Sequence, residues 1–187
     1  MTPQAEVATN ILVALALATQ ATALILIALR FFFVKTWRML AVRYGHLGYL
    51  TAMLFSVSAL VGSMIYGDIT GFEACPLCWA SRILMIFTFG TLLFGIKSAL
   101  KHRFAFAGTL LAVLGLCVSG YQYLLQWLAL KGTHLPCPAV SSLPSCDKVY
   151  FVKFGFITIP FVAFSAFLLI LLLLAFFHER KLAESSL

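Results

Sequence analysis

Charged residues are scarce in this sequence, and acidic residues are the scarcest among them. Of 187 residues only 10% are charged and 6 are Asp or Glu, whereas 63% are hydrophobic. The mean hydropathy is +1.04, which excludes an ordinary soluble domain. The chain contains several apolar runs of the roughly 20 residues that one helix needs to cross a bilayer. Internal repeats and low-complexity linkers are lacking, so we expect an all-α membrane protein with one compact helical bundle.

The sequence also lacks a basic segment before its first apolar run, where the only charged residue is Glu6. That run extends from about Ile11 to Val34. A signal peptide would have a positive n-region and a shorter apolar core with a cleavage site. We therefore expect a retained membrane-spanning helix. Four further apolar runs are predicted to cross the membrane, at about residues 47–66, 79–96, 104–128 and 156–177.

Basic residues are concentrated on alternate connections between these runs. One side of the membrane receives Lys35, Arg38, Arg43, Lys97, Lys101, Arg103, Arg180 and Lys181, and the other receives Lys131, Lys148 and Lys153. The more basic side is expected to be cytoplasmic. This places the N-terminus and residues 68–75 and 129–155 on the outer side, and the C-terminus inside. The same bias accounts for the net charge of +7, so we expect contacts with the lipid bilayer and no nucleic acid.

Four of the five cysteines lie on the predicted outer side, in two pairs. Cys75 and Cys78 form a Cys-Pro-Leu-Cys motif at the start of the third helix, and Cys137 and Cys146 lie in the second outer loop. Paired cysteines in an oxidising compartment indicate disulfides more readily than a four-cysteine zinc site, so no metal is expected. Cys117 lies alone within the fourth run and is expected to be a small apolar packing residue.

The first pair is better explained by reactivity than by stability. A disulfide between Cys75 and Cys78 would close a very small loop and contribute little chain entropy. Cys78 is also expected at a helix N-terminus, where the dipole favours a thiolate. Prolines around Cys137 and Cys146 disfavour regular structure in the second outer loop. A disulfide there is expected to be exposed and exchange-competent, the alternative being a staple for the loop.

Arg82 is a further candidate for the site. It follows Cys78 by four residues and therefore shares its helix face, about one turn deeper in the membrane. An ionisable residue at that depth is by default a functional candidate, although a side chain near a helix end can also extend to the lipid headgroups. Beside a thiolate, a permanent cation stabilises negative charge on the sulfur and on a reduced acceptor.

Several of these motifs together resemble the DsbB/BdbC disulfide bond formation proteins. They are Cys-Pro-Leu-Cys-Trp-Ala-Ser-Arg-Ile-Leu-Met at 75–85, the following helical pair, the later cysteine pair, and Gly-Phe-Ile-Thr-Ile-Pro at 155–160. The resemblance implies a four-helix transmembrane bundle of the DsbB type over residues 47–177, in a bacterial inner membrane. Residues 1–46 then add one N-terminal transmembrane helix and a basic cytoplasmic connection. Residues 178–187 form a cytoplasmic tail.

The resemblance also implies a reaction. A DsbA-like periplasmic partner with a thioredoxin fold would attack the Cys137/Cys146 disulfide, at Cys137, and the reduced pair would pass electrons to Cys75 and Cys78. The acceptor would be ubiquinone or menaquinone from the membrane quinone pool, with Cys78 nearest to it and Arg82 beside its ring oxygens. Gln122 stands where relatives often have a histidine near the quinone, so it is a further candidate ligand.

Two other functions remain as alternatives. A vitamin K epoxide reductase-like enzyme also links a CxxC motif to quinones, but there the loop pair precedes the CxxC motif, whereas here it follows. A transporter or assembly protein with structural disulfides is the other alternative. The sequence contains no pair of broken helices and no intramembrane acidic residues of the kind that transporters use.

Overall fold

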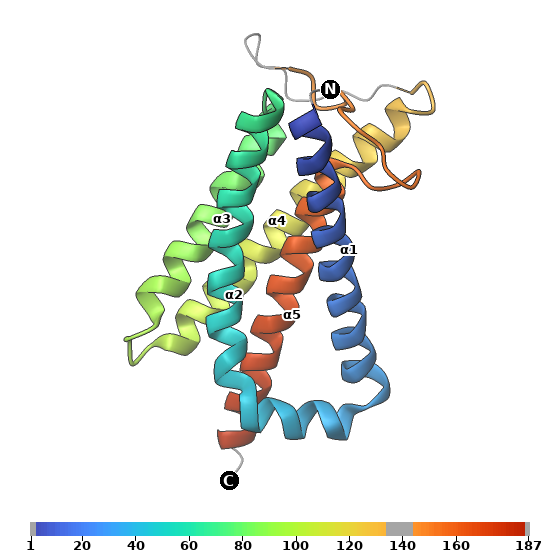
Figure 1. Cartoon of the computed structure of the whole chain (residues 1–187). Helices are drawn as coiled ribbons and strands as arrows, with labels where there is room; N and C mark the ends of the chain where they lie inside the picture. The colour runs from blue at the N-terminus through green and yellow to red at the C-terminus, as the bar shows by residue number, and fades with distance from the viewer. Residues whose placement is uncertain (1–2, 134–143, 186–187) are drawn as a thin grey trace.

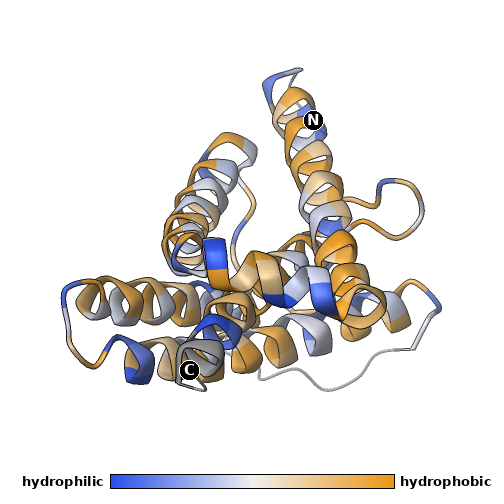
Figure 2. Cartoon of the chain, turned by 90° about the horizontal axis from the view of Figure 1, so that it is seen from below, coloured by the Kyte–Doolittle hydropathy of each residue, from blue (hydrophilic) through white to orange (hydrophobic). Residues whose placement is uncertain are grey.

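The computed structural model describes residues 3–133 and 144–185 of the chain, and within these ranges its main elements are five α-helices. Every one of them is long and apolar enough to cross a membrane, and hydrophobic positions predominate along them (Figure 2). The prediction of an all-α membrane protein with five crossings is confirmed. The helices are α1 (Pro3–Phe32), α2 (Val34–Thr70), α3 (Pro76–Gly95), α4 (Lys101–Ala129) and α5 (Ile159–Ser185).

Four of the helices form a bundle and the first lies beside it. Helix α3 packs between α2 and α4, and α5 contacts both α2 and α4. Helix α1 packs outside this group, against α5 and α2 (Figure 1). This is the predicted arrangement of a four-helix bundle with one additional N-terminal helix.

Helix α2 begins earlier than the sequence predicted. The basic stretch expected to connect the first two spans is helical, and the first turns of α2 run across the lower end of the molecule before the helix turns upward (Figure 1). Trp37 in this stretch is buried, and its ring lies 4.9 Å from that of Phe176 in α5. Lys35 and Arg38 remain exposed. One face of the stretch therefore packs on the bundle while its charges stay outside.

The bundle core depends on close approach between helices. A side chain at Gly115 in α4 would overlap the ring of Phe167 in α5, and a Cβ atom at Gly48 in α2 would lie 2.7 Å from the Leu173 carbonyl oxygen. Small residues at such crossings let helix backbones pack closely. This packing stabilises helix association inside a membrane, where the hydrophobic effect does not drive it. The Tyr49 hydroxyl donates a hydrogen bond of 2.6 Å to the carbonyl of Leu92, which ties α2 to α3.

The described parts of the two cysteine-bearing segments, both predicted to be outer, lie together at the end of the molecule where the N-terminus also lies (Figure 1). Helix α2 ends at Gly71, which adopts the left-handed conformation with φ 66°. Beyond it, the ring of Phe72 stacks on that of Tyr150 at 4.3 Å, and the Tyr150 hydroxyl donates to the carbonyl of Glu73 at 2.8 Å. The two Tyr150 contacts hold the two segments against each other. The amide of Gln126 in α4 donates to the Lys148 carbonyl at 2.9 Å, which ties the second segment to α4.

Candidate redox site

The Cys-Pro-Leu-Cys motif forms the first turn of α3. Cys75 is the N-cap, and its sulfur accepts a hydrogen bond of 3.3 Å from the backbone N–H of Cys78. Pro76 follows as the first helical residue, where its missing N–H loses no helical hydrogen bond. This turn brings the two sulfurs to 2.8 Å from each other. Both cysteines are free, and the distance exceeds the bond of about 2.05 Å in a disulfide, so the pair is a dithiol.

Gln122 of α4 contacts both sulfurs of this pair. Its side chain is 2% exposed, and its amide nitrogen lies 3.2 Å from the Cys75 sulfur and 3.0 Å from the Cys78 sulfur. Such donors stabilise a negatively charged sulfur more than a neutral one, because hydrogen bonds to ions are the stronger kind. The structure therefore brings the sequence candidate Gln122 to the thiols, and the residue also lines the adjacent cavity.

The two sulfurs of the pair have different surroundings. Cys75 is 3% exposed and packs in one buried cluster with Leu125 and Cys146. Cys78 lines a cavity within the helices, whereas Cys75 does not. The hydrogen bond that the Cys75 thiol donates to the Cys78 sulfur, together with burial, raises the pKa of the Cys75 thiol above its ordinary value. Cys75 is therefore the member of the pair that keeps its proton.

The second cysteine pair is described only in part. Cys146 is 1% exposed and disulfide-bonded, while Cys75, Cys78 and Cys117 are free. Cys137 lies outside the described residues. The buried position of Cys146 brings its segment to the first turn of α3, whereas the sequence had predicted an exposed disulfide in this loop.

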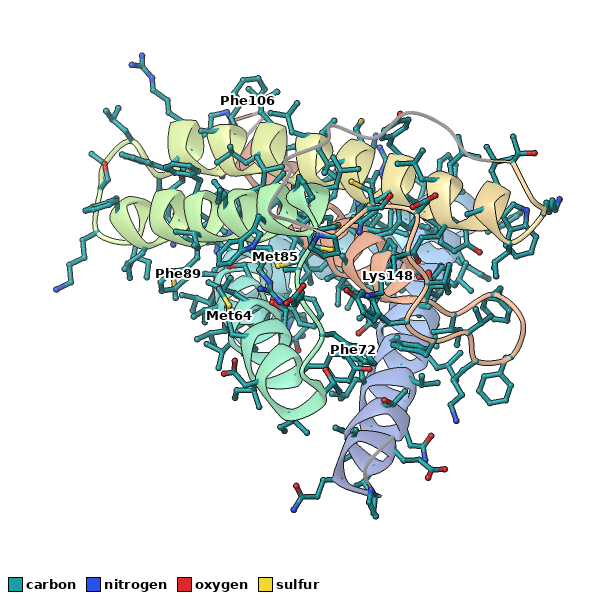
Figure 3. All side chains as sticks on the ribbon, turned by 90° about the horizontal axis from the view of Figure 1, so that it is seen from above. Met64, Phe72, Met85, Phe89, Phe106 and Lys148 are labelled. Atoms are coloured by element: carbon teal, nitrogen blue, oxygen red, sulfur yellow. The ribbon has the colours of Figure 1, made fainter. Side chains whose placement is uncertain are left out.

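A cavity of about 310 Å³ lies beside Cys78, between α1, α2, α3 and α5. Its polar lining includes Arg82, Gln122 and Tyr150, while most of the remaining lining is apolar. Phe72 also contributes to its lining, and seen from above this side chain lies between the outer parts of α1 and α2 (Figure 3). The shape and polarity suit a molecule with a polar head and an apolar body.

Arg82 reaches the same cavity from α3. Its guanidinium donates a hydrogen bond of 3.0 Å to the carbonyl of Ser63 in α2, and lies 5.4 Å from the centre of the Trp79 ring. These two contacts fix a permanent positive charge in the cavity wall. The charge sits on the same helix face as Cys78, one turn further in, as the four-residue spacing predicted.

Two cavity residues were missed by sequence reasoning. Ser81 is 5% exposed, and its hydroxyl has no hydrogen-bond partner among the described residues. Its only sequence signal is its position three residues after Cys78. Tyr150 comes from the second outer segment, and no local pattern connects it with the motif. Burial, followed by the negative charges of Cys78 and Glu73, raises the pKa of Tyr150, so its phenol stays a neutral hydrogen-bond donor.

Cys117 differs from its predicted environment. It was expected to be a packing residue, but the structure places it on the exposed surface of α4. The reason is its register: the face of α4 that enters the bundle contains Ala112, Gly115 and Ser119, and position 117 falls between these buried residues on the opposite side. Cys117 has no contact with the two outer pairs in the described structure.

The sequence is similar to those of known disulfide bond formation proteins. The family model described as "Disulfide bond formation protein DsbB" matches residues 46–177. A probable disulfide formation protein of Oceanobacillus iheyensis is 38% identical over 116 residues, covering 62% of this chain and 77% of the relative. The probable disulfide formation protein C of Bacillus cereus is 38% identical over 123 residues, with 65% and 84% covered. The disulfide bond formation protein C of Bacillus subtilis is 34% identical over 126 residues, with 66% and 86% covered. No solved structure matches the chain.

Proposed function

Because the chain belongs to the DsbB family of disulfide bond formation proteins, we propose that it reoxidises a DsbA-like periplasmic thiol oxidase and passes the electrons to a membrane quinone. The family makes the chain a membrane thiol oxidoreductase that forms disulfide bonds. One observation supports the finer proposal above all others. The CxxC pair stands between the second outer cysteine segment, which touches Cys75, and a largely apolar cavity, which Cys78 lines.

The outer half of the reaction uses the disulfide of Cys146, which we assign to Cys137. A thiolate of the partner attacks Cys137 and displaces Cys146, and the second partner thiol then breaks the mixed disulfide. The partner leaves oxidised, and the loop pair has gained two electrons and two protons. Attack at Cys137 is favoured because Cys146 is buried in the cluster with Cys75 and Leu125.

The transfer between pairs follows from that cluster. In the oxidised CxxC pair, the thiolate of Cys146 attacks the sulfur of Cys75 and displaces Cys78 as a thiolate. Cys137 then attacks Cys146, which re-forms the loop disulfide and leaves Cys75 and Cys78 reduced.

The cavity fits a quinone on two counts. Its lining holds the Arg82 cation and the Ser81 hydroxyl, which has no hydrogen-bond partner among the described residues, and both match the oxygens of a quinone ring. Its remaining wall is largely apolar, which matches a hydrocarbon tail. Ser81, Arg82 and Gln122 would hold the ring beside Cys78, and a bound quinone would supply a two-electron, two-proton acceptor.

The residues of the chain prepare the sulfurs for that oxidation. Gln122 and the N-terminus of α3 stabilise negative charge on the pair, and Arg82 adds a fixed cation in a region of low dielectric constant. Cys75 keeps its proton until its sulfur bonds to that of Cys78. The pair loses two electrons and two protons, and the sulfurs close from 2.8 Å to bonding distance.

The distribution of basic residues supports an orientation for the proposed activity. We place the cysteine-bearing end and the N-terminus in the periplasm and the C-terminus in the cytoplasm of a bacterial inner membrane. Within the chain, residues 1–46 form the added helix and its connection, residues 47–177 the catalytic bundle, and residues 178–187 the tail.

A reconstituted assay tests the proposal. The purified protein is mixed with a reduced thioredoxin-fold partner and either a ubiquinone or a menaquinone analogue, and the fall in quinone absorbance is followed. Replacement of Cys75, Cys78, Cys137 or Cys146 by Ala should abolish turnover, whereas Cys117→Ala should not. Loss of activity in a folded Cys117→Ala protein, with activity retained in Cys137→Ala, would contradict the two-pair scheme.

The order of the pairs has its own test. With Cys137 and Cys146 both replaced by Ala, the CxxC pair should still react with quinone, but oxidation of the partner should fall to background. Stopped-flow mixing of the preoxidised variant with reduced partner measures this step. Undiminished oxidation would mean that the partner reaches Cys75 and Cys78 directly.

A further inference from the structure

Helix α1 has no role in the scheme above, because the family match begins at residue 46 and leaves the whole helix outside. The structure nevertheless places it at the site. Leu12, Leu15, Ala16 and Thr19 of α1 line the same cavity as Cys78. A helix outside the family match thus contributes to the wall of the cavity beside the redox pair.

Contacts near both ends hold α1 in this position. Near its outer end, the hydroxyls of Thr9 and Tyr66 lie 3.0 Å apart, and Thr9 is 1% exposed. Val13 packs in a buried cluster with Tyr66 and Phe151. At the inner end, Arg30 forms a 3.0 Å salt bridge with Glu179 of α5. The helix is therefore attached to α2, to α5 and to the second outer segment, and it is not a free lipid-facing span.

The cavity changes character from α3 toward α1. On the side of α3 it is lined by Cys78, Ser81 and Arg82. Beside the α1 side chains, the lining includes apolar residues of α2 and α5, among them Phe55, Ala59, Val162, Ala163 and Ala166. An occupant whose polar ring lies at Cys78 can therefore place its apolar part along α1. Thr19 adds no polarity there, because its hydroxyl donates to the Leu15 carbonyl within the helix.

We infer that α1 is the binding wall for the hydrocarbon tail of the quinone, with Leu12, Leu15 and Ala16 in contact with the tail. The inference rests on the proposed function and deepens it, since it assigns a tail subsite to a helix outside the family match. The occupant is the tail of the same molecule whose ring lies at Cys78, because the cavity is continuous between the two regions. The helix thereby sets which tail lengths the enzyme uses well.

A matched pair of variants on α1 tests the inference. Leu15 and Leu24 are similarly exposed, at 61% and 57%, but only Leu15 lines the cavity. Leu15→Trp and Leu24→Trp are compared in the full chain, with two quinones that share a headgroup and differ in having a long prenyl tail or none. A misfit in an apolar pocket commonly changes discrimination by about tenfold or more. Leu15→Trp should raise KM for the tailed quinone about tenfold and leave the tailless quinone within about twofold of the wild type.

The remaining outcomes decide between explanations. Leu24→Trp should match the wild type with both quinones, and turnover of the tailless quinone reports that each variant is folded. The tail subsite would be refuted if Leu15→Trp affected both quinones equally, or if the two variants behaved alike. In either case the α1 wall would contact bilayer lipid and not the quinone tail. Such a result would leave the proposed function standing, whereas a wild-type protein that reduces neither quinone would refute both.

Discussion

The side-chain nitrogen of Gln122 lies 3.0 Å from the sulfur of Cys78, although the two residues are 44 positions apart in the sequence. The contact joins α4 to the first turn of α3 and puts an amide donor on the sulfur that lines the cavity. Gln122 therefore contacts the reacting sulfur itself. This makes it a residue of the thiol chemistry as well as a candidate ligand of the quinone.

Replacing Gln122 should lower the reactivity of Cys78. In Gln122→Leu the sulfur loses a donor, and a hydrogen bond to a charged group contributes about 1.5 to 3 kcal/mol. We expect alkylation of Cys78 in the reduced protein to slow by about tenfold or more at pH 7. Timed labelling followed by mass spectrometry measures the rate. Gln126→Leu is the control, since Gln126 is bound to the Lys148 carbonyl and not to the sulfurs; equal slowing in both variants would argue against the assigned role.

The raised pKa of Cys75 predicts a pH dependence. A raised pKa keeps the thiol protonated at neutral pH, so its thiolate fraction, and with it the alkylation rate, should grow as the pH rises from 7 to 9. At pH 7, Cys78 should be labelled well before Cys75. In Cys78→Ala the hydrogen bond that raises the pKa most is lost, so Cys75 should react faster than in the parent protein. Equal labelling of both cysteines at pH 7 would contradict the asymmetry.

Removal of the Arg82 charge should impair use of the quinone more than thiol exchange. Loss of one such group that stabilises developing charge costs about 3 to 4 kcal/mol, or roughly a hundredfold or more in rate, and solvent near the interface reduces this. Arg82→Ala should therefore slow steady-state quinone reduction while the first oxidation of partner by preoxidised enzyme stays nearly normal. Arg82→Lys should restore part of the rate, because it returns the charge without the planar fork.

The test of Arg82 compares the single-turnover oxidation of partner with steady-state quinone reduction over a range of quinone concentrations. Equal losses in the single-turnover and steady-state measurements, or an unchanged dependence on quinone, would make the residue an anchor to the lipid headgroups instead.

Ser81 offers a smaller and more local test. Its buried hydroxyl is without a hydrogen-bond partner in the part of the chain that the structure describes, so Ser81→Ala removes no internal bond. If the hydroxyl binds a quinone oxygen, KM should rise by about two- to tenfold, the value of one hydrogen bond of about 0.5 to 1.5 kcal/mol. Ser119→Ala is the control, because that buried hydroxyl is bound to the Gly115 carbonyl of its own helix. If Ser81→Ala raised the melting temperature and left KM for the quinone unchanged, Ser81 would have only a packing role.

The membrane fold could be predicted from the sequence because its signals are local. Apolar runs of sufficient length define the five spans, and Pro76 with its flanking cysteines marks the start of α3. The spacing of Cys78 and Arg82 places both on one helix face without any tertiary information. These features depend on residues close together in the chain.

The rest of the site depends on how the helices pack, which the local sequence does not specify. Helix α1 is apolar on nearly every side, so nothing in its sequence indicates which face meets the cavity. The contacts of Gln122 and Tyr150 with the site require the register of α4 on α3 and the fold of the second outer segment. The helical start of α2 was missed because Trp37 is stabilised there by Phe176 of α5, far away in the sequence.

In the proposed function, the single helical turn between Cys75 and Cys78 would also separate an aqueous from an apolar environment. Cys75 packs against the segment that reaches the aqueous side, and Cys78 lines a cavity walled by membrane-spanning helices. Exchange of one disulfide bond across this turn would carry electrons from a water-soluble protein to a lipid-soluble carrier, although neither molecule leaves its own phase. The cysteines would thus transfer electrons between the aqueous and the membrane phase, and the two substrates would not need to contact each other.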